Sequence, residues 1–100
     1  SSAHKGKIKG WKLHKNMTMN LIVPSGTVKF VFFDEKFKCH KELTIGRLNY
    51  CRVTVPPKIW FAFQGLDNKD PNLVFNFANL QHDPDEVIRK DINEIFYNWS

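Results

Sequence analysis

Lys12 and His14 are the residues of this sequence whose types and spacing most suggest chemistry. Residues 8–15 alternate as a β-strand does, so Lys12 and His14 project to one face and Trp11 and Leu13 to the other. An imidazole titrates near neutral pH and can transfer a proton, and a lysine beside it can attract an anion. A lone histidine on a strand is more often a surface residue or a satisfied core residue, so both interpretations stand at this point.

Two further histidines have neighbours that could take part in chemistry. His82 precedes Asp83, and the two could form a histidine–carboxylate pair. His40 follows Cys39 in a polar stretch, but no other ligand stands at a spacing typical of zinc, so we expect no metal site. The simplest interpretation of Cys39 and Cys51 is two free thiols in a reducing compartment, and a single disulfide between them stays open.

Charge is distributed unevenly along the chain, whose formal net charge is +5. Six lysines and no acid precede Asp34, whereas residues 83–94 hold five acids against Arg89 and Lys90. The asymmetry favours an anionic partner near the first strands. The alternative for any single lysine is an ordinary solvated surface residue.

Strand-like runs separated by turn residues account for most of the chain. Pro56 and Pro57 fix φ and remove two backbone donors, so they force a turn between two runs that favour β-structure. The predicted strands are 8–15, 17–23, 28–33, 48–55, 59–63 and 73–78, with a loop or edge hairpin over 36–48. Six or seven strands in 100 residues predict a single all-β domain, a sandwich or barrel, with an inner lining that includes Phe30, Phe32, Phe61, Phe63 and Phe75.

The two ends of the chain differ in character from this β-rich region. We expect no regular structure in residues 1–6, which are small and polar. Asp83 as N-cap and Pro84 at the first helical position predict a short helical turn, followed by an irregular C-terminal arm. No run approaches the ~18 apolar residues of a membrane span, and no signal peptide is evident, so we expect a cytoplasmic protein without a membrane partner.

Three stretches in this order resemble the dTDP-4-dehydrorhamnose 3,5-epimerase family of the cupin superfamily, in particular its short, divergent members. They are residues 7–15 (KIKGWKLHK), 55–63 (VPPKIWFAF) and 79–86 (NLQHDPDE). The resemblance implies an antiparallel jelly-roll β-barrel, a homodimer, and a nucleotide-linked 4-keto-6-deoxy sugar as substrate. It also implies an isomerase of deoxysugar and surface polysaccharide biosynthesis that uses no metal and no other cofactor.

The same resemblance implies roles for individual residues. Family members abstract a proton beside the ketone and return one from the other face, which needs a base, a group that stabilises the enolate oxygen, and an acid. We expect His14 as the base, Lys12 beside the enolate oxygen, and His82 near the position of the family's catalytic tyrosine. Substrate binding is assigned to Lys9, Asn20 and Gln81.

The sequence departs from the family pattern at several of these positions. The residue two after Gly10, where the family has its base, is Lys12, and Phe61 stands where the family has a second pocket histidine. The aspartate that orients the family's base has its position beyond Ser100, so His14 is predicted to lack a carboxylate partner.

Two alternatives of other classes remain. A cupin that binds a nucleotide sugar without catalysis predicts affinity but no proton exchange. A small basic barrel for single-stranded nucleic acid would use the lysines and exposed aromatic side chains, and we rank it third, because the aromatic residues alternate as core residues do.

Overall fold

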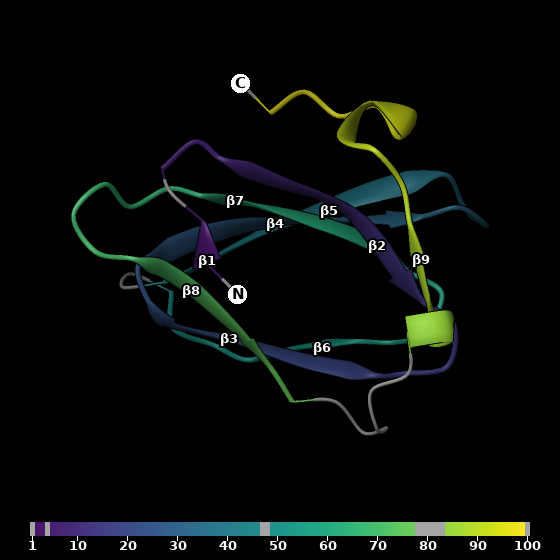
Figure 1. The fold of residues 1–100 in the computed structure, drawn as a ribbon, viewed down its shortest axis with the longest axis horizontal. Coiled ribbons are helices and arrows are strands. Elements are labelled where there is room, and N and C mark those ends of the chain that lie inside the picture. Colours follow the sequence, from purple (N-terminus) through teal and green to yellow (C-terminus); the bar gives the residue numbers. More distant parts are fainter. Residues whose placement is uncertain (1, 4, 47–48, 78–83, 100) are drawn as a thin grey trace.

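The computed structural model of the 100-residue chain describes residues 2–3, 5–46, 49–77 and 84–99, which form two antiparallel β-sheets packed face to face (Figure 1). One sheet has the strand order β1-β8-β3-β6 and the other β5-β4-β7-β2-β9. The strands are β1 (Ser2–Ala3), β2 (Ile8–His14), β3 (Met19–Ser25), β4 (Thr27–Asp34), β5 (Cys39–Gly46), β6 (Val53–Val55), β7 (Trp60–Gly65), β8 (Asn72–Asn76) and β9 (Val87–Arg89). Two 3-10 turns, η1 (Pro84–Glu86) and η2 (Ile92–Glu94), flank β9. The predicted all-β jelly-roll fold is confirmed.

The double-proline turn connects β6 to β7, as the sequence predicts. Lys58, directly after Pro57, has a φ of 68°, a left-handed conformation that few non-glycine residues adopt. In this conformation the Lys58 amide donates a hydrogen bond to the carbonyl of His14 at 2.7 Å. The turn therefore anchors the end of β2.

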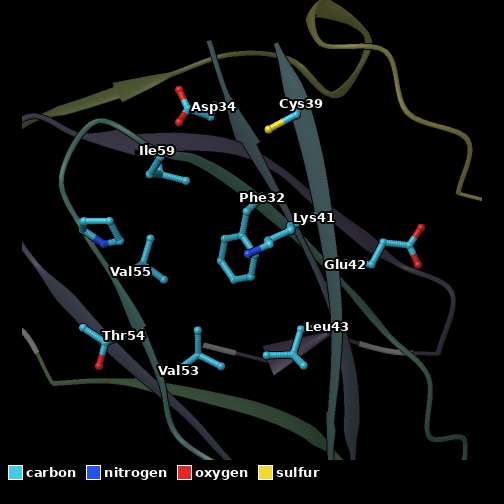
Figure 2. A pocket seen from close by; sticks show the side chains of 11 residues that line it. Phe32, Asp34, Cys39, Lys41, Glu42, Leu43, Val53, Thr54, Val55 and Ile59 are labelled. Atoms are coloured by element: carbon cyan, nitrogen blue, oxygen red, sulfur yellow. The ribbon is translucent and has the colours of Figure 1, made fainter. Parts of the chain in front are cut away.

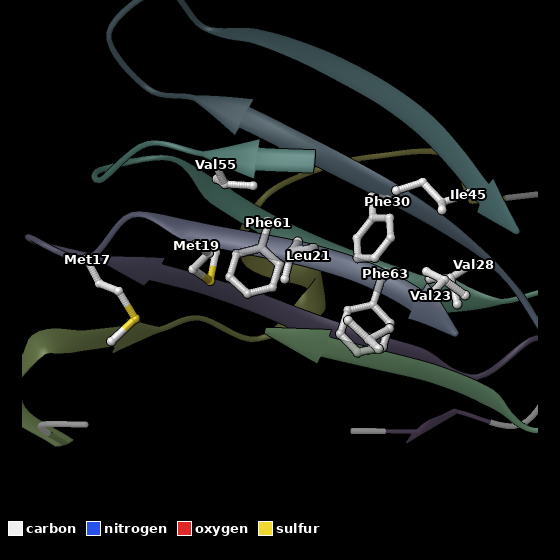
Figure 3. Close-up of a cluster of buried hydrophobic side chains, with 11 residues drawn as sticks. Met17, Met19, Leu21, Val23, Val28, Phe30, Ile45, Val55, Phe61 and Phe63 are labelled. Atoms are coloured by element: carbon white, nitrogen blue, oxygen red, sulfur yellow. The ribbon is translucent and has the colours of Figure 1, made fainter. Parts of the chain in front are cut away.

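The core between the two sheets is built from side chains of both inner faces (Figure 3). Its buried members are Met17, Met19, Leu21, Val23, Val28, Phe30, Ile45, Val55, Phe61, Phe63 and Val74. Phe30, Phe61 and Phe63 are buried as predicted, and Phe32 packs partly buried beside them. Such interdigitated apolar packing supplies most of the driving force for a domain of this size.

The prediction that Phe75 lies inside is wrong, because its side chain is 47% exposed. Alternation along β8 decides this: Val74 points into the core, so Phe75 must point to the outer face of the four-stranded sheet. Phe77, 58% exposed, does not line the core either.

A second apolar cluster covers the outer face of the five-stranded sheet. Trp11, Val31, Trp60 and Ala62 supply its sheet side, and Ile95 of the C-terminal arm covers them. Figure 1 shows the arm, with η2, on the side of this sheet that faces away from the other sheet. The predicted short helical turn and arm are thus present, and the arm completes this second apolar cluster.

Several boundaries differ from the sequence-based expectations. Residues 39–46 form a full edge strand, β5, where we expected a loop or hairpin, while β6 is only three residues long. Ser2 and Ala3, expected to lack structure, pair with β8, and β9 continues the second sheet within the predicted arm. Both cysteines are free thiols. Across the described ranges, no helix has the length and apolar character needed to cross a bilayer.

Candidate active site

His14 is the last residue of β2, and its ring lies on the inner face of the five-stranded sheet. The ring stacks on Phe61 of β7, with centroids 6.3 Å apart and planes 13° apart, and its side chain is 12% exposed. Its Nδ1 lies 2.7 Å from Oε1 of Glu86, which is buried in η1. The structure therefore gives this histidine a carboxylate partner, and the prediction that it lacks one is wrong.

Glu86 accepts more than this one hydrogen bond. Its Oε2 accepts hydrogen bonds from the backbone amides of Asn16 and Met17, the latter at 3.0 Å. Burial alone would raise the pKa of Glu86, but the hydrogen bonds from the Asn16 amide, His14 and the Met17 amide outweigh it and lower the pKa to about 2. The carboxylate is therefore ionised at neutral pH.

An ionised carboxylate fixes the tautomer of the neutral imidazole. Since Glu86 can only accept, Nδ1 of His14 must carry the proton that it shares with Oε1. The lone pair of the neutral ring then resides on Nε2. The carboxylate also stabilises the imidazolium that forms when Nε2 takes up a proton, so the pair has the arrangement of an oriented general base.

A β-bulge in β2 changes which residues face inward. Lys9 pairs with Phe63 and Lys12 with Phe61, so three steps on β2 match two on β7. Both bulge residues face outward: Trp11 is in the outer cluster, and a Cβ on Gly10 would lie 3.4 Å from backbone atoms of the C-terminal arm. Lys9 therefore joins Lys12 and His14 on the inner face, although simple alternation places it on the other.

Arg89 of β9 completes a cluster of cations at this position. Lys12 and Arg89 are register partners on neighbouring strands, so their side chains share a face. The pKa of Lys12 is lowered by burial first, and then by the positive charges of Arg89 and Lys9. We call Lys9, Lys12 and Arg89 the basic cluster; sequence reasoning assigned no role to Arg89.

The other predicted site residues are not part of this arrangement. Asn20 points away from the core on β3, where its side chain bonds to the Phe77 carbonyl at 3.1 Å and to Thr54 Oγ1 at 2.8 Å. Its observed contacts hold three strand segments together. Gln81 and His82 lie outside the described residues, and their roles stay predictions.

A cavity of about 600 Å³ opens between the β4–β5 hairpin and β6 (Figure 2). Its floor is apolar, and Asp34 and Lys41 stand at its edge with Cys39 and Thr54. The Glu42 carboxylate points away from the cavity and lies 3.8 Å from Nζ of Lys29 (Figure 2). Neither His14 nor the basic cluster lines it. Phe32 connects the two regions, because it lines the cavity and is the register partner of Phe61, on which His14 stacks. The β4–β6 cavity and His14 therefore share one inner surface, two strands apart.

The residues that the structure describes contain no evident metal-binding site. No three histidine, cysteine, aspartate or glutamate side chains there gather closely enough to hold an ion. Metal independence stays a prediction.

Known structures with this fold include enzymes that act on nucleotide sugars. A dTDP sugar isomerase from Desulfovibrio desulfuricans G20 superposes with a TM-score of 0.90 at 27% identity, covering 99% of this chain and 68% of that one. A dTDP-4-dehydrorhamnose 3,5-epimerase from Sulfolobus tokodaii has a TM-score of 0.80 at 20% identity, covering 97% and 58%. QdtA, a sugar 3,4-ketoisomerase from Thermoanaerobacterium thermosaccharolyticum in complex with TDP, has a TM-score of 0.74 at 18% identity, covering 95% and 69%.

Comparison by sequence, unlike comparison by structure, identifies no related protein. No protein-family model matches the sequence, and no curated protein matches it. This chain spans just over half the length of the epimerase structure and about a quarter of the capsular polysaccharide assembling protein CapF, which also shares its fold. The chain is a cupin-fold protein, and its resemblance to the dTDP-4-dehydrorhamnose 3,5-epimerase-like family is confirmed.

Proposed function

We propose that the protein is a sugar epimerase or isomerase that acts on a nucleotide-linked 4-keto-6-deoxy sugar. The observation that carries this proposal is the His14–Glu86 pair, in which an ionised, buried carboxylate orients an imidazole on the inner face of the barrel. The fold shared with a dTDP sugar isomerase supports the substrate class. Nucleotide-sugar binding would also suit the net charge of +5.

The proposed reaction begins with proton abstraction next to the ketone. Nε2 of His14 takes the proton, the C–H electron pair becomes the double bond of an enolate, and the negative charge moves to the former ketone oxygen. Lys12, two residues earlier on the same face, stabilises that oxygen, and Glu86 stabilises the imidazolium. Return of a proton to the opposite face of the same carbon inverts the centre. The ketone moves instead when the hydroxyl on that carbon gives its proton to the enolate oxygen and the carbon proton returns to the former ketone carbon.

Deuterium incorporation tests this function directly. A dTDP-linked 4-keto-6-deoxy sugar incubated with the protein in deuterated water is expected to gain deuterium at C3, or at C3 and C5, if a centre is inverted, and at C4 if the ketone moves to C3. NMR spectroscopy of the recovered sugar reads the label and identifies any inverted centre. If the protein binds the nucleotide sugar but no label enters, the proposal fails in favour of a non-catalytic nucleotide-sugar binder.

We also propose a homodimer formed through sheet edges or the N-terminal strand. Strands β5, β6 and β9 are edges of the two sheets, and exposed strand edges favour further pairing unless they are covered. Light scattering at high protein concentration is expected to give twice the mass of the chain. A monomer mass under these conditions would contradict the dimer.

The state of the two cysteines suggests a cellular location. Two free thiols suit a reducing compartment, so we place the protein in the cytoplasm. There it would serve deoxysugar and surface polysaccharide biosynthesis.

A further inference from the structure

Glu86 is held against His14 by a short segment that buries little apolar surface of its own. η1 and β9 have three residues each, and β9 lies at the edge of the five-stranded sheet. Along β9, Val87 is half-buried, while Ile88 and Arg89 are exposed. Such an edge strand opens easily, because each of its backbone hydrogen bonds makes only a small net contribution to stability. β9 alone is therefore a weak support for the carboxylate.

The apolar burial of this part of the chain comes after β9, in residues 90–99, which we call the outer arm. The Lys90 amide donates a hydrogen bond to the Trp11 carbonyl at 3.0 Å, and Nε1 of Trp11 donates to the Ile92 carbonyl at 3.2 Å. Ile95, 6% exposed, then packs into the second apolar cluster beside Trp11. Burial of an isoleucine side chain stabilises a structure far more than an exposed strand residue does. The outer arm therefore anchors the end of β9.

Contacts of the outer arm reach parts of the sheet that are far from β9 (Figure 1). Nζ of Lys90 lies 4.8 Å from the centre of the Trp60 ring and 3.4 Å from Oε1 of Glu35, in the turn between β4 and β5. The same Glu35 oxygen accepts a hydrogen bond from Nε1 of Trp60 at 2.5 Å. The Tyr97 ring contacts His40 of β5, with centroids 5.6 Å apart. These anchors on β7, β5 and the β4–β5 turn fix the outer arm independently of β9.

We propose that Ile95 is a positioning residue, because the outer arm, docked on the outer face of the sheet, holds Glu86 against His14 on the inner face. The continuous backbone from η1 through β9 connects the two faces. When Ile95 leaves its site, β9 loses its anchor, and Glu86 separates from His14 and from the amides of Asn16 and Met17. The consequence for catalysis rests on the proposed function, whereas the positioning of Glu86 does not.

Amide hydrogen exchange measured by NMR tests this positioning without any substrate. The amides of Asn16 and Met17 both donate to Oε2 of Glu86, so their protection reports whether the carboxylate is in place. Ile95→Ala is expected to lower the protection of both amides about tenfold or more, since it removes most of a buried side chain. Ile95→Val, which removes one methyl group, should retain most of the protection. Wild-type protection in Ile95→Ala would mean that β9 alone holds Glu86, and would overturn the proposal.

Two matched controls separate positioning from general stability. Phe96→Ala truncates an 84% exposed side chain of the same arm and should change the protection of the two amides less than about twofold. Ile45→Ala truncates a buried side chain of the core between the sheets, so it destabilises the domain without loosening the outer arm. It should leave both amides nearly as protected as in wild type. If Ile45→Ala lowers their protection as much as Ile95→Ala does, the amides exchange only when the whole domain unfolds, and the proposal fails.

A variant on β2 displaces the outer arm without altering any of its residues. A Cβ on Gly10 would lie 3.4 Å from the Ile92 amide nitrogen and from the Lys90 carbonyl oxygen. The two γ-methyl groups of a valine need more room than this. Gly10→Val is therefore expected to push the outer arm away and to lower the protection of the same two amides about tenfold or more. Wild-type protection in Gly10→Val would contradict the proposal.

Deuterium incorporation into the keto sugar separates this inference from the proposed function. In Ile95→Ala the rate is expected to fall toward that of Glu86→Gln, and combining the two substitutions should add little, because Ile95 acts through Glu86. If the amide results hold but wild type incorporates no deuterium, the positioning of Glu86 stands and the proposed function falls. If wild type incorporates deuterium, and Ile95→Ala is as fast with both amides fully protected, the function stands and the positioning role falls.

Discussion

Replacing His14 with glutamine is expected to slow deuterium incorporation into the keto sugar about a hundred- to ten-thousandfold, the usual contribution of a general base. Glutamine is similar in size and can still hydrogen-bond to Glu86, but its amide does not accept a proton at neutral pH. The affinity for dTDP should remain nearly unchanged, because the proposed base acts on the sugar, which dTDP lacks. NMR measures the exchange, and calorimetry the affinity.

His40→Gln is the matched control. His40 lies on β5, and its ring contacts Phe33 and Tyr97 at centroid distances of 4.7 and 5.6 Å, on the outer side of the sheet. The His40→Gln substitution should leave deuterium incorporation and dTDP affinity near those of wild type. If His14→Gln retains most of the exchange, or if His40→Gln loses as much, His14 is not the base.

Six of the nine strands and the fold family were predictable from the sequence, and the carboxylate partner of His14 was not. His14 and Glu86 are 72 positions apart, and nothing in local spacing brings them together. Asp83 and Pro84 predict only a short helical turn in this segment, which gives the Glu86 carboxylate no particular partner. The actual segment is one 3-10 turn followed by a three-residue strand, too short to show any periodicity.

The inner face of β2 shows a different limit of sequence reasoning. Strict alternation places Lys9 opposite Lys12 and His14, and a single bulge reverses this. Gly10 was the available signal, because a glycine inside a strand often marks a bulge or a close backbone approach. The prediction that Phe75 is buried was wrong for a related reason. Aromatic residues at every second position predict a strand, but they do not show which of its two faces is buried.

Replacing Glu86 with glutamine is expected to reduce the exchange rate roughly ten- to hundredfold, because a neutral amide no longer stabilises the imidazolium and does not enforce the Nδ1–H tautomer. Affinity for dTDP should remain near that of wild type. Glu94→Gln, at an exposed carboxylate that accepts a hydrogen bond from the Asp91 amide, provides the matched control and should react as wild type does.

The same substitution should change how stability depends on acid. The pKa of Glu86 is lowered from 4.5 to about 2 in the folded protein, so the unfolded chain binds more protons between these values. The stabilisation by this carboxylate is therefore complete above about pH 5 and is lost as the pH falls toward 2. Glu86→Gln should be less stable than wild type at neutral pH, and the two should converge near pH 2. Urea unfolding across this pH range measures the difference. If the free energies of unfolding of wild type and Glu86→Gln differ by the same amount at every pH, the carboxylate is not held ionised by His14 and the two amides. The tautomer assigned to His14 would then lose its basis.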